Sequence, residues 1–247
     1  MKKSKNTISK NLPVKLLLSV IVLTLLAFYL KTFFTTGAYF EKTFLKKESS
    51  SSETQYIGKS KYGKIKITVK ELSSSPRRLS VVYELPNNIK REHTVSFKDG
   101  NNDNSRLAIE NIKDENDTVI LTGGFYDKDS GALLDEVQNP VFEEKLNVVP
   151  KGQSPFVENY KISPSTTLDF ANSVRDTHRG NYYLLFGAFI ILAITFIDIK
   201  FPLFFFNLRH MWTVENPEPS ELYILIQKIW WFVGPAISVI VMIVAII

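Results

Sequence analysis

Residues 229–247 read IWWFVGPAISVIVMIVAII and carry no charge. A helix rises about 1.5 Å per residue, so crossing a hydrocarbon core of ~30 Å takes about 20 residues. Two other apolar stretches, LLLSVIVLTLLAFYL at 16–30 and YLLFGAFIILAITFI at 183–197, are shorter but continue into apolar neighbours. The sequence therefore predicts an integral membrane protein with transmembrane helices at 16–40, 182–200 and 229–247.

Two charges interrupt the second of these stretches. Asp198 and Lys200 separate it from the apolar run Phe201–Phe206. Ionisable side chains inside a span are costly and often functional, so these two residues are consistent with a polar path for an ion or solute. A lysine near a span end can also extend its ammonium group to the lipid headgroups. Because both residues lie at the predicted cytoplasmic end, we interpret them as charges that mark the membrane edge.

The tail before the first span contains basic residues and no acidic one. Its lysines are Lys2, Lys3, Lys5, Lys10 and Lys15. Basic residues stay on the cytoplasmic side, so this tail, 1–15, is predicted to lie on the cytoplasmic side of a bacterial cytoplasmic membrane. Residues 41–181 are then extracytoplasmic, and the loop 201–228 is cytoplasmic or interfacial. A cleaved signal peptide, with small residues at 36–38, is the alternative for the first span, and the large segment is exported in either case.

Charge and cysteine content limit the function classes. The formal net charge is +5, but the basic tail accounts for it, and basic and acidic residues nearly balance in the exported segment. A nucleic-acid surface concentrates basic charge on a folded domain, so no nucleic-acid partner is predicted. The tail is suited to contact with anionic lipid. The chain has no cysteine, which excludes disulfides and zinc–thiolate sites.

The exported segment divides into a linker, a β domain and a connector. Residues 41–55 include a serine run and are predicted to be a flexible linker. Within 56–149, several short segments alternate apolar and polar residues, which is typical of strands with one buried face. The clearest is 64–70, and turn-forming residues separate the others. We predict an immunoglobulin-like β-sandwich, followed by a connector, 150–181, with a short helix from about 165.

One acidic turn invites comparison with a calcium loop. Asp127-Lys128-Asp129-Ser130-Gly131 is followed by Asp135 and Glu136. The glycine and the final glutamate of an EF-hand are both out of place here, and a hairpin turn explains these residue types better. None of the three histidines, His93, His178 and His210, has ligand spacing or a recognisable catalytic partner. No catalytic, metal or cofactor-binding residue is therefore assigned.

The segment between the second and third spans has the most distinctive local sequence. It contains Trp212 and then Glu218, Pro219, Ser220, Glu221, Leu222 and Tyr223. Glu218 followed by proline indicates a helix start, with Pro219 in the first turn. With Lys228 and the final span, this pattern resembles a family of small bacterial membrane proteins of unknown function, over about 182–247. The resemblance implies a helical hairpin with a candidate interaction motif at its inner end, and it implies no reaction.

Three functions remain open at this point. The first is a non-catalytic cell-envelope protein whose exported β domain binds a ligand or a partner, with the lipid bilayer and a possible membrane protein as further partners. The second is an accessory subunit of a transport complex that uses Asp198 and Lys200. The third is an exported enzyme acting on envelope polymer, for which Asp127, Asp129 and Asp135 would have to converge. The absence of reactive constellations favours the first.

Overall fold

A computed structural model describes residues 12–98, 105–141, 153–212 and 218–247. The chain forms two compact units. The β unit comprises Thr36–Thr177, and the helical unit comprises the chain up to Thr35 together with His178–Ile247. A large antiparallel sheet thus lies in sequence between the first and second long helices, as the sequence predicts.

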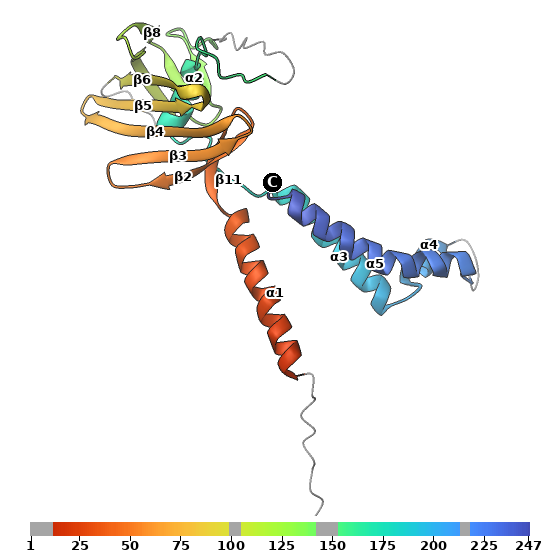
Figure 1. Cartoon of the computed structure of the whole chain (residues 1–247). Helices are drawn as coiled ribbons and strands as arrows, with labels where there is room; N and C mark the ends of the chain where they lie inside the picture. Colours follow the sequence, from red (N-terminus) through yellow and green to blue (C-terminus); the bar gives the residue numbers. More distant parts are fainter. Residues whose placement is uncertain (1–11, 99–104, 142–152, 213–217) are drawn as a thin grey trace, which may run out of the picture. The chain divides into compact units, whose positions relative to one another are not determined.

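The β unit is built on one curled sheet (Figure 1). Its strand order is β10-β9-β7-β6-β5-β4-β3-β2-β1-β11, and β8 pairs with β7 beside this path. The strands are β1 (Thr36–Phe40), β2 (Thr43–Ser49), β3 (Glu53–Ser60), β4 (Gly63–Ser74), β5 (Arg77–Leu85), β6 (Ile89–Phe97), β7 (Arg106–Lys113), β8 (Val119–Thr122), β9 (Phe125–Asp127), β10 (Ala132–Leu134) and β11 (Thr177–His178). All strand pairs from β1 through β10 are antiparallel.

Alternation in the sequence sets the buried face of this sheet. In β4, Ile65 and Ile67 are fully buried, whereas Lys64 is exposed and Lys66, which lies between the two isoleucines, is partly exposed. The same face continues on β5 with Val81 and Tyr83, and both are fully buried. The strand predicted at 64–70 is therefore confirmed, and it extends to Ser74. The last part of the β domain predicted at 56–149, residues 142–149, lies outside the described residues.

The linker predicted at 41–55 is wrong. Residues 43–49 form β2, and the third strand begins at Glu53. Leu45 and Tyr56 explain why, because both side chains are fully buried in the core of the unit. The serine run occupies only the turn between these strands, where Ser50 and Glu53 are hydrogen-bonded. The first helix correspondingly ends at Phe33 rather than at residue 40, and β1 follows almost at once.

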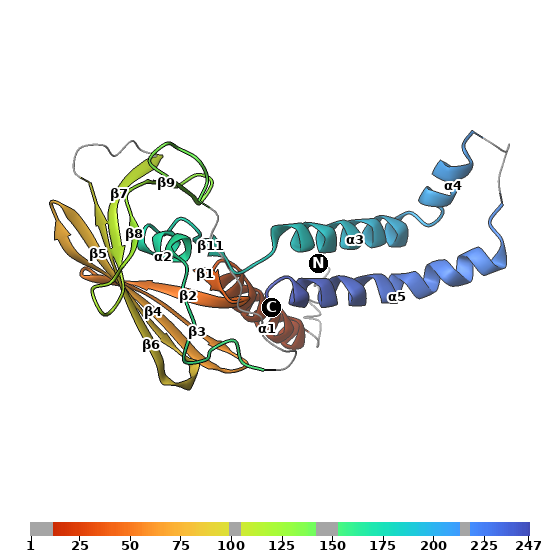
Figure 2. The same cartoon turned by 90° about the horizontal axis from the view of Figure 1, so that it is seen from above.

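The predicted immunoglobulin-like sandwich is not confirmed. The strands join in one path rather than in two facing sheets, and helix α2 (Pro164–Ala171) packs on the concave face against β5 and β6 (Figure 2). Leu168 and Phe170 are buried in the core that the sheet encloses. The helix predicted from about 165 is present and ends at Ala171, because Asn172 caps it and Ser173 follows with a φ of 54°.

The helical unit contains three helices that are long and apolar enough to cross a membrane. They are α1 (Leu12–Phe33), α3 (Tyr182–Lys200) and α5 (Glu221–Val244), with the short α4 (Phe204–His210) between the last two. Helices α3 and α5 lie side by side (Figure 2). The number of long apolar helices and their approximate positions agree with the sequence prediction.

Hydrogen bonds link one end of each of these three helices. The Gly180 amide donates to the Phe33 carbonyl at 2.9 Å, which connects the end of α1 to the start of α3. The Asn181 amide donates to the Ala245 carbonyl at 2.8 Å, which connects the start of α3 to the end of α5. These contacts bring the end of α1, the start of α3 and the end of α5 together.

Candidate functional site

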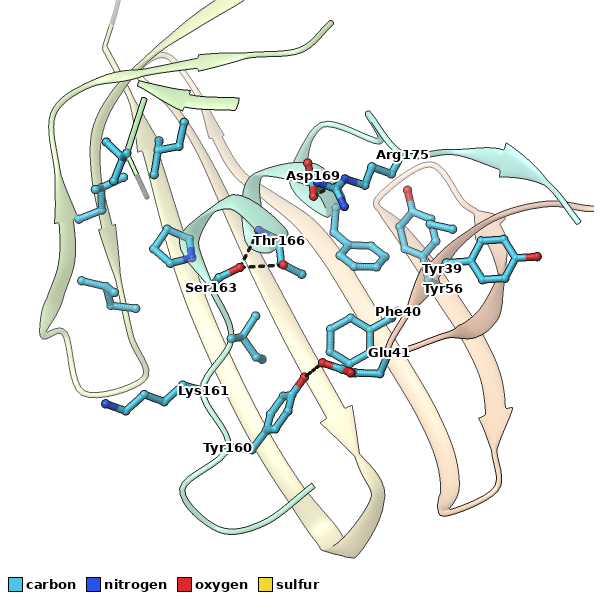
Figure 3. A pocket seen from close by; sticks show the side chains of 18 of the residues that line it. Tyr39, Phe40, Glu41, Tyr56, Tyr160, Lys161, Ser163, Thr166, Asp169 and Arg175 are labelled. Carbon is cyan, nitrogen blue, oxygen red and sulfur yellow. Dashed lines mark hydrogen bonds and ion pairs between the residues drawn. The ribbon is translucent and has the colours of Figure 1, made fainter. Parts of the chain in front are cut away.

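A pocket of about 820 Å³ lies within the β unit, at the open side of the curled sheet (Figure 3). Its walls come from β1 and β8, and its floor comes from α2 and the segment that leads into it. We call it the seam pocket; it is lined by Ala38, Tyr39, Phe40, Glu41, Tyr56, Ile120, Leu121, Leu133, Val141, Asn159, Tyr160, Lys161, Ile162, Ser163, Pro164, Thr166, Asp169, Phe170, Arg175 and Asp176. Its size is within the range of small-molecule sites.

The turn between β1 and β2 positions Glu41. Glu41 and Lys42 have φ values of 45° and 62°, so the two-residue turn has left-handed backbone at both positions. Glycine and asparagine favour that conformation, and other residues adopt it at a cost of about 1–2 kcal/mol each. The Tyr160 hydroxyl donates to Glu41 Oε1 at 2.6 Å. The turn therefore holds a carboxylate at the pocket wall despite an unfavourable backbone.

Helix α2 positions the central charged pair. Ser163 caps the helix through the Thr166 amide, and Pro164 occupies the first turn, so the sequence starts the helix at this point. Asp169 is 4% exposed and lies on the buried side of the helix. Its Oδ1 accepts from the Tyr126 hydroxyl at 2.6 Å, and its Oδ2 contacts Arg175 Nε at 2.7 Å. The arginine is thereby fixed by a buried carboxylate.

A third carboxylate completes the polar side of the pocket. Asp176 Oδ1 accepts from the Tyr56 hydroxyl at 2.9 Å, and Oδ2 accepts from the Lys47 ammonium group. Tyr56 also contacts the Ser173 hydroxyl at 2.9 Å. Each of the three pocket carboxylates therefore accepts from a tyrosine: Glu41 from Tyr160 and Asp176 from Tyr56, which both line the pocket, and Asp169 from Tyr126, which lies behind it in the core.

Burial determines the protonation of these tyrosines. Desolvation is the main cause that raises the pKa of Tyr56, Tyr126 and Tyr160, and in each case the neighbouring carboxylate raises the pKa further. The hydroxyls are therefore protonated at neutral pH and act as hydrogen-bond donors. Such tyrosines orient carboxylates and do not serve as bases.

The opposite side of the pocket is apolar. Ile120 and Leu121 come from β8, Leu133 comes from β10, and Ile162 precedes α2. Ile120 is 40% exposed, so its side chain is accessible to a molecule in the pocket. The pocket therefore combines an apolar wall with a wall of charged groups and tyrosines.

The acidic turn has no catalytic geometry. Asp127 Oδ1 accepts from the Asp129 and Ser130 amides, and Asp135 Oδ1 accepts from two amides of its own turn. These backbone hydrogen bonds lower the pKa of both carboxyl groups. The predicted hairpin is formed, because Asp127 pairs with Ala132 between β9 and β10. The aspartates thus stabilise their own turns and do not converge in a groove.

The histidines do not form a site in the described part of the chain. His93 is buried, and its Nδ1 lies 2.7 Å from the Thr167 hydroxyl in the core. His210 Nδ1 contacts the Phe206 carbonyl, and His178 Nδ1 contacts the Phe34 carbonyl. No group of three or more histidine, aspartate or glutamate residues that could hold a metal is found among the described residues.

Asp198 is buried between α3 and α5. It is 6% exposed, and its carboxylate accepts from Gln227 Nε2 at 2.7 Å and from Trp231 Nε1 at 2.9 Å. Lys200 is exposed, and its ammonium group lies over the rings of Phe196 and Phe201. Asp198 and Lys200, which were considered together in the sequence analysis, therefore have different surroundings.

Two further contacts lie in the interface between α3 and α5. The Ser238 hydroxyl donates to the Ala188 carbonyl at 2.9 Å, and Gly234 packs against Thr195. A Cβ added at Gly234 would lie 2.4 Å from the Thr195 hydroxyl oxygen, so this position requires glycine. Gln227, Trp231, Gly234 and Ser238 follow one another at intervals of three or four residues. That spacing, in a mostly apolar helix, is the sequence signal that could have identified the face of α5 that packs against α3.

The candidate interaction motif lies at the start of α5. The helix cap is Ser220, which accepts from the Tyr223 amide at 3.2 Å, so the expected start at Glu218 and Pro219 is two residues too early. A serine hydroxyl can accept from the third amide of a helix, and this contact defines the first turn. The Tyr223 ring packs on Phe206 with centroids 5.0 Å apart. Glu221 begins the helix, and Trp212 and Leu222 are exposed.

Fold and site together define a β-domain protein with three candidate membrane-spanning helices and a pocket in the β domain. Residues 186–247 match the model of a family of unknown function, DUF6199. The resemblance inferred for the C-terminal quarter is thus confirmed as a match to an uncharacterised family, and the match covers the α3–α5 hairpin and not the β unit. Comparisons with curated proteins and with solved structures gave no match.

Proposed function

We propose that this chain is a non-catalytic membrane protein of the bacterial cell envelope, whose β unit lies outside the cytoplasmic membrane and binds a ligand in the seam pocket. The observation that carries the proposal is the pocket itself, with an apolar wall facing three oriented carboxylates. Binding sites are commonly concave and largely apolar, with a few placed polar groups. Long apolar helices at both ends of the β unit are consistent with an anchored receptor.

Membrane orientation follows from the lysine-rich tail and the alternation of the spans. Basic residues retained in the cytoplasm place the end of α1 outside. The hydrogen bonds that join the end of α1, the start of α3 and the end of α5 are consistent with these three ends lying on one side of the membrane. The start of α5 and its motif then lie at the cytoplasmic face, where a membrane-protein partner is proposed to dock.

An occluded variant tests the proposed pocket. Ile120 lines the pocket, and its neighbour Val119 on the same strand does not. Ile120→Trp therefore adds bulk to the pocket, and Val119→Trp places the same bulk at a neighbouring exposed position that does not line the pocket, which makes it a matched control. Full-length protein extracted with its surrounding lipid is examined by native mass spectrometry for a co-purified small molecule. We expect a bound species in the wild type and in Val119→Trp that is absent in Ile120→Trp.

Two results would count against the proposal. The first is a wild-type protein that carries no small molecule after extraction from its own membrane. The second is a bound species that Ile120→Trp retains at the wild-type level, because the ligand would then lie elsewhere.

The alternative functions receive less support from the geometry. A transport path that uses Asp198 and Lys200 requires both to face one polar route, but Asp198 is bonded to α5 and Lys200 is exposed. An enzyme that uses Asp127, Asp129 and Asp135 requires a shared groove, and the carboxylates of Asp127 and Asp135 cap separate turns. Neither arrangement supports a second candidate function.

A further inference from the structure

The ligand of the seam pocket has to satisfy two unlike walls. The apolar wall includes Ile120, Leu133 and Ile162, and water in contact with it is displaced favourably by an apolar group. The polar wall carries Arg175, the carboxylates of Glu41, Asp169 and Asp176, and the tyrosines Tyr56 and Tyr160. A ligand with an apolar body and one polar end fits both walls, whereas a wholly polar or wholly apolar ligand fits only one.

The carboxylates on the polar wall already accept hydrogen bonds from the protein. Asp169 accepts from Tyr126 and is paired with Arg175, and Asp176 accepts from Tyr56 and Lys47. The two aspartate charges are therefore balanced by neighbouring cations. Glu41 accepts from Tyr160 and lies in the exposed turn at the rim. Recognition of the polar end consequently depends on which donors remain.

Arg175 retains donors for a ligand. Its Nε faces Asp169 Oδ2 at 2.7 Å, and its side chain is 55% exposed. A guanidinium group has five N–H donors, and the two terminal nitrogens have no other hydrogen bond or ion pair within the described part of the chain. The buried Asp169 fixes the plane of the group, and Tyr126 fixes Asp169. An arginine held in this way presents a planar fork that matches a carboxylate or a phosphate.

We propose that the seam pocket binds an amphipathic anion with a single apolar chain, its carboxylate or phosphate group on Arg175 and its chain against the β8 side. This inference rests on the proposed ligand-binding function. Carboxylate-headed and phosphate-headed amphiphiles share the chemistry that Arg175 recognises. A protein whose helices lie in lipid is continuously exposed to molecules of this kind.

Three probes of equal chain length separate the head group from the chain. Full-length protein is placed in phosphatidylcholine nanodiscs and titrated with radiolabelled dodecanoate, dodecyl phosphate or dodecyltrimethylammonium. Empty nanodiscs provide the value for partition into lipid, which is subtracted. We expect saturable binding of the two anions, with an affinity at least about tenfold above that of the cation. The stronger of the two anions identifies the source of the head group.

Variants of Arg175 test the anchor. Arg175→Gln removes a charge-assisted contact, so the affinity for both anions is expected to fall about tenfold or more, with no fall for the cation. Arg78→Gln is the control, because Arg78 is exposed on β5 and does not line the pocket. If Arg175→Gln unfolds because Asp169 loses its cation, the double variant Asp169→Asn/Arg175→Gln leaves no unpaired buried charge and replaces it.

The outcomes separate this inference from the proposed function. Equal binding of anion and cation by the wild type overturns the assignment of Arg175, and so does wild-type anion affinity in both variants. If either of these results is obtained and Ile120→Trp still abolishes binding of all three probes, the pocket remains a ligand site, and the head group of its ligand is not recognised by Arg175. Absence of saturable binding for every probe overturns the inference alone, because the co-purified ligand is detected independently.

Discussion

Substitution of Asp198 tests whether the α3–α5 hairpin depends on its buried polar contact. Asp198→Ala removes the acceptor of two hydrogen bonds, from Gln227 at 2.7 Å and from Trp231 at 2.9 Å. Both donors lie on α5. Because Asp198 is only 6% exposed, water has little access to this site and does not readily replace the lost carboxylate. The variant therefore leaves two donors without a partner between apolar helices.

The size of the effect follows from the number of contacts. Hydrogen bonds between membrane helices contribute on average about 0.6 kcal/mol each and at most about 1.7 kcal/mol. Two such bonds predict a loss of about 1–3 kcal/mol in the free energy of unfolding. Removal of the carboxylate also removes the cost of its burial, which lowers the apparent loss. A double-mutant cycle with Gln227→Leu cancels that cost and isolates the contact between the two side chains.

The assay titrates the full chain in mixed micelles with denaturant and measures the free energy of reversible unfolding. We expect a coupling free energy of about 0.6–1.7 kcal/mol between positions 198 and 227. Asp198→Asn retains one acceptor oxygen and should lose less than Asp198→Ala. Lys200→Ala is the control, because Lys200 is exposed and has no hydrogen bond to α5 among the described contacts. A coupling of zero within error, or an equal loss in Lys200→Ala, would refute the reasoning.

Four other predictions concern packing, the pocket, pH and topology. Gly234→Ala should destabilise the hairpin by about 1–3 kcal/mol, because its Cβ would meet the Thr195 hydroxyl at 2.4 Å, and Thr195→Ala should restore most of the loss in the same assay. Tyr160→Phe should lower the stability of the β unit by about 1 kcal/mol through loss of the Glu41 contact, measured by thermal unfolding, and Tyr39→Phe, whose hydroxyl has no hydrogen bond among the described residues, is the control. Burial lowers the pKa of His93, so the unfolded chain binds the proton more readily; stability should be complete above pH ~6.5 and decline below it, and His93→Gln should flatten that decline. The chain has no native cysteine, so Ser50→Cys should react with an impermeant maleimide on intact cells, whereas Leu222→Cys should react only after permeabilisation, and the reverse pattern would overturn the orientation.

Periodicity predicted the parts of the fold in which one physical preference dominates. The apolar stretches at 16–30, 183–197 and 229–247 correspond to the three long helices, because a run without charge favours lipid over water at every position. The alternation at 64–70 gave a strand because Ile65 and Ile67 share the buried face. Strand order and curvature stayed beyond prediction, since they depend on pairings between distant segments.

The failures arise where a short local signal conflicts with packing. The serine run near residue 50 is polar and suggested a linker, but Leu45 and Tyr56 on either side are fully buried and bring both flanks into the sheet. The helix α2 lies inside the curled sheet instead of a second sheet, because Leu168 and Phe170 fill the concave face. A sandwich and a curled sheet around a helix produce the same alternation in each strand, so alternation alone does not distinguish them.

The seam pocket was missed for the same reason. Its carboxylates come from Glu41 and, far along the sequence, from Asp169 and Asp176, and each meets a tyrosine that is distant in the sequence only after the sheet has curled. Asp198 could be found in the sequence by its charge, but its hydrogen bonds to Gln227 and Trp231 on another helix are visible only in the structure. Titratable residues can be found in a sequence, whereas the groups that balance them are a property of the fold.

The turn at Glu41 and Lys42 connects the fold of the β unit to its pocket. A two-residue hairpin with left-handed backbone at both positions normally selects asparagine and glycine, so nothing in the local sequence predicts a turn here. The conformation persists because β1 and β2 pair on either side of it and Tyr160 holds the Glu41 carboxylate. Strain of this kind is retained where the surrounding structure fixes it and is frequent at binding sites. The strained backbone at Glu41 is thus consistent with the ligand site that we propose for this pocket.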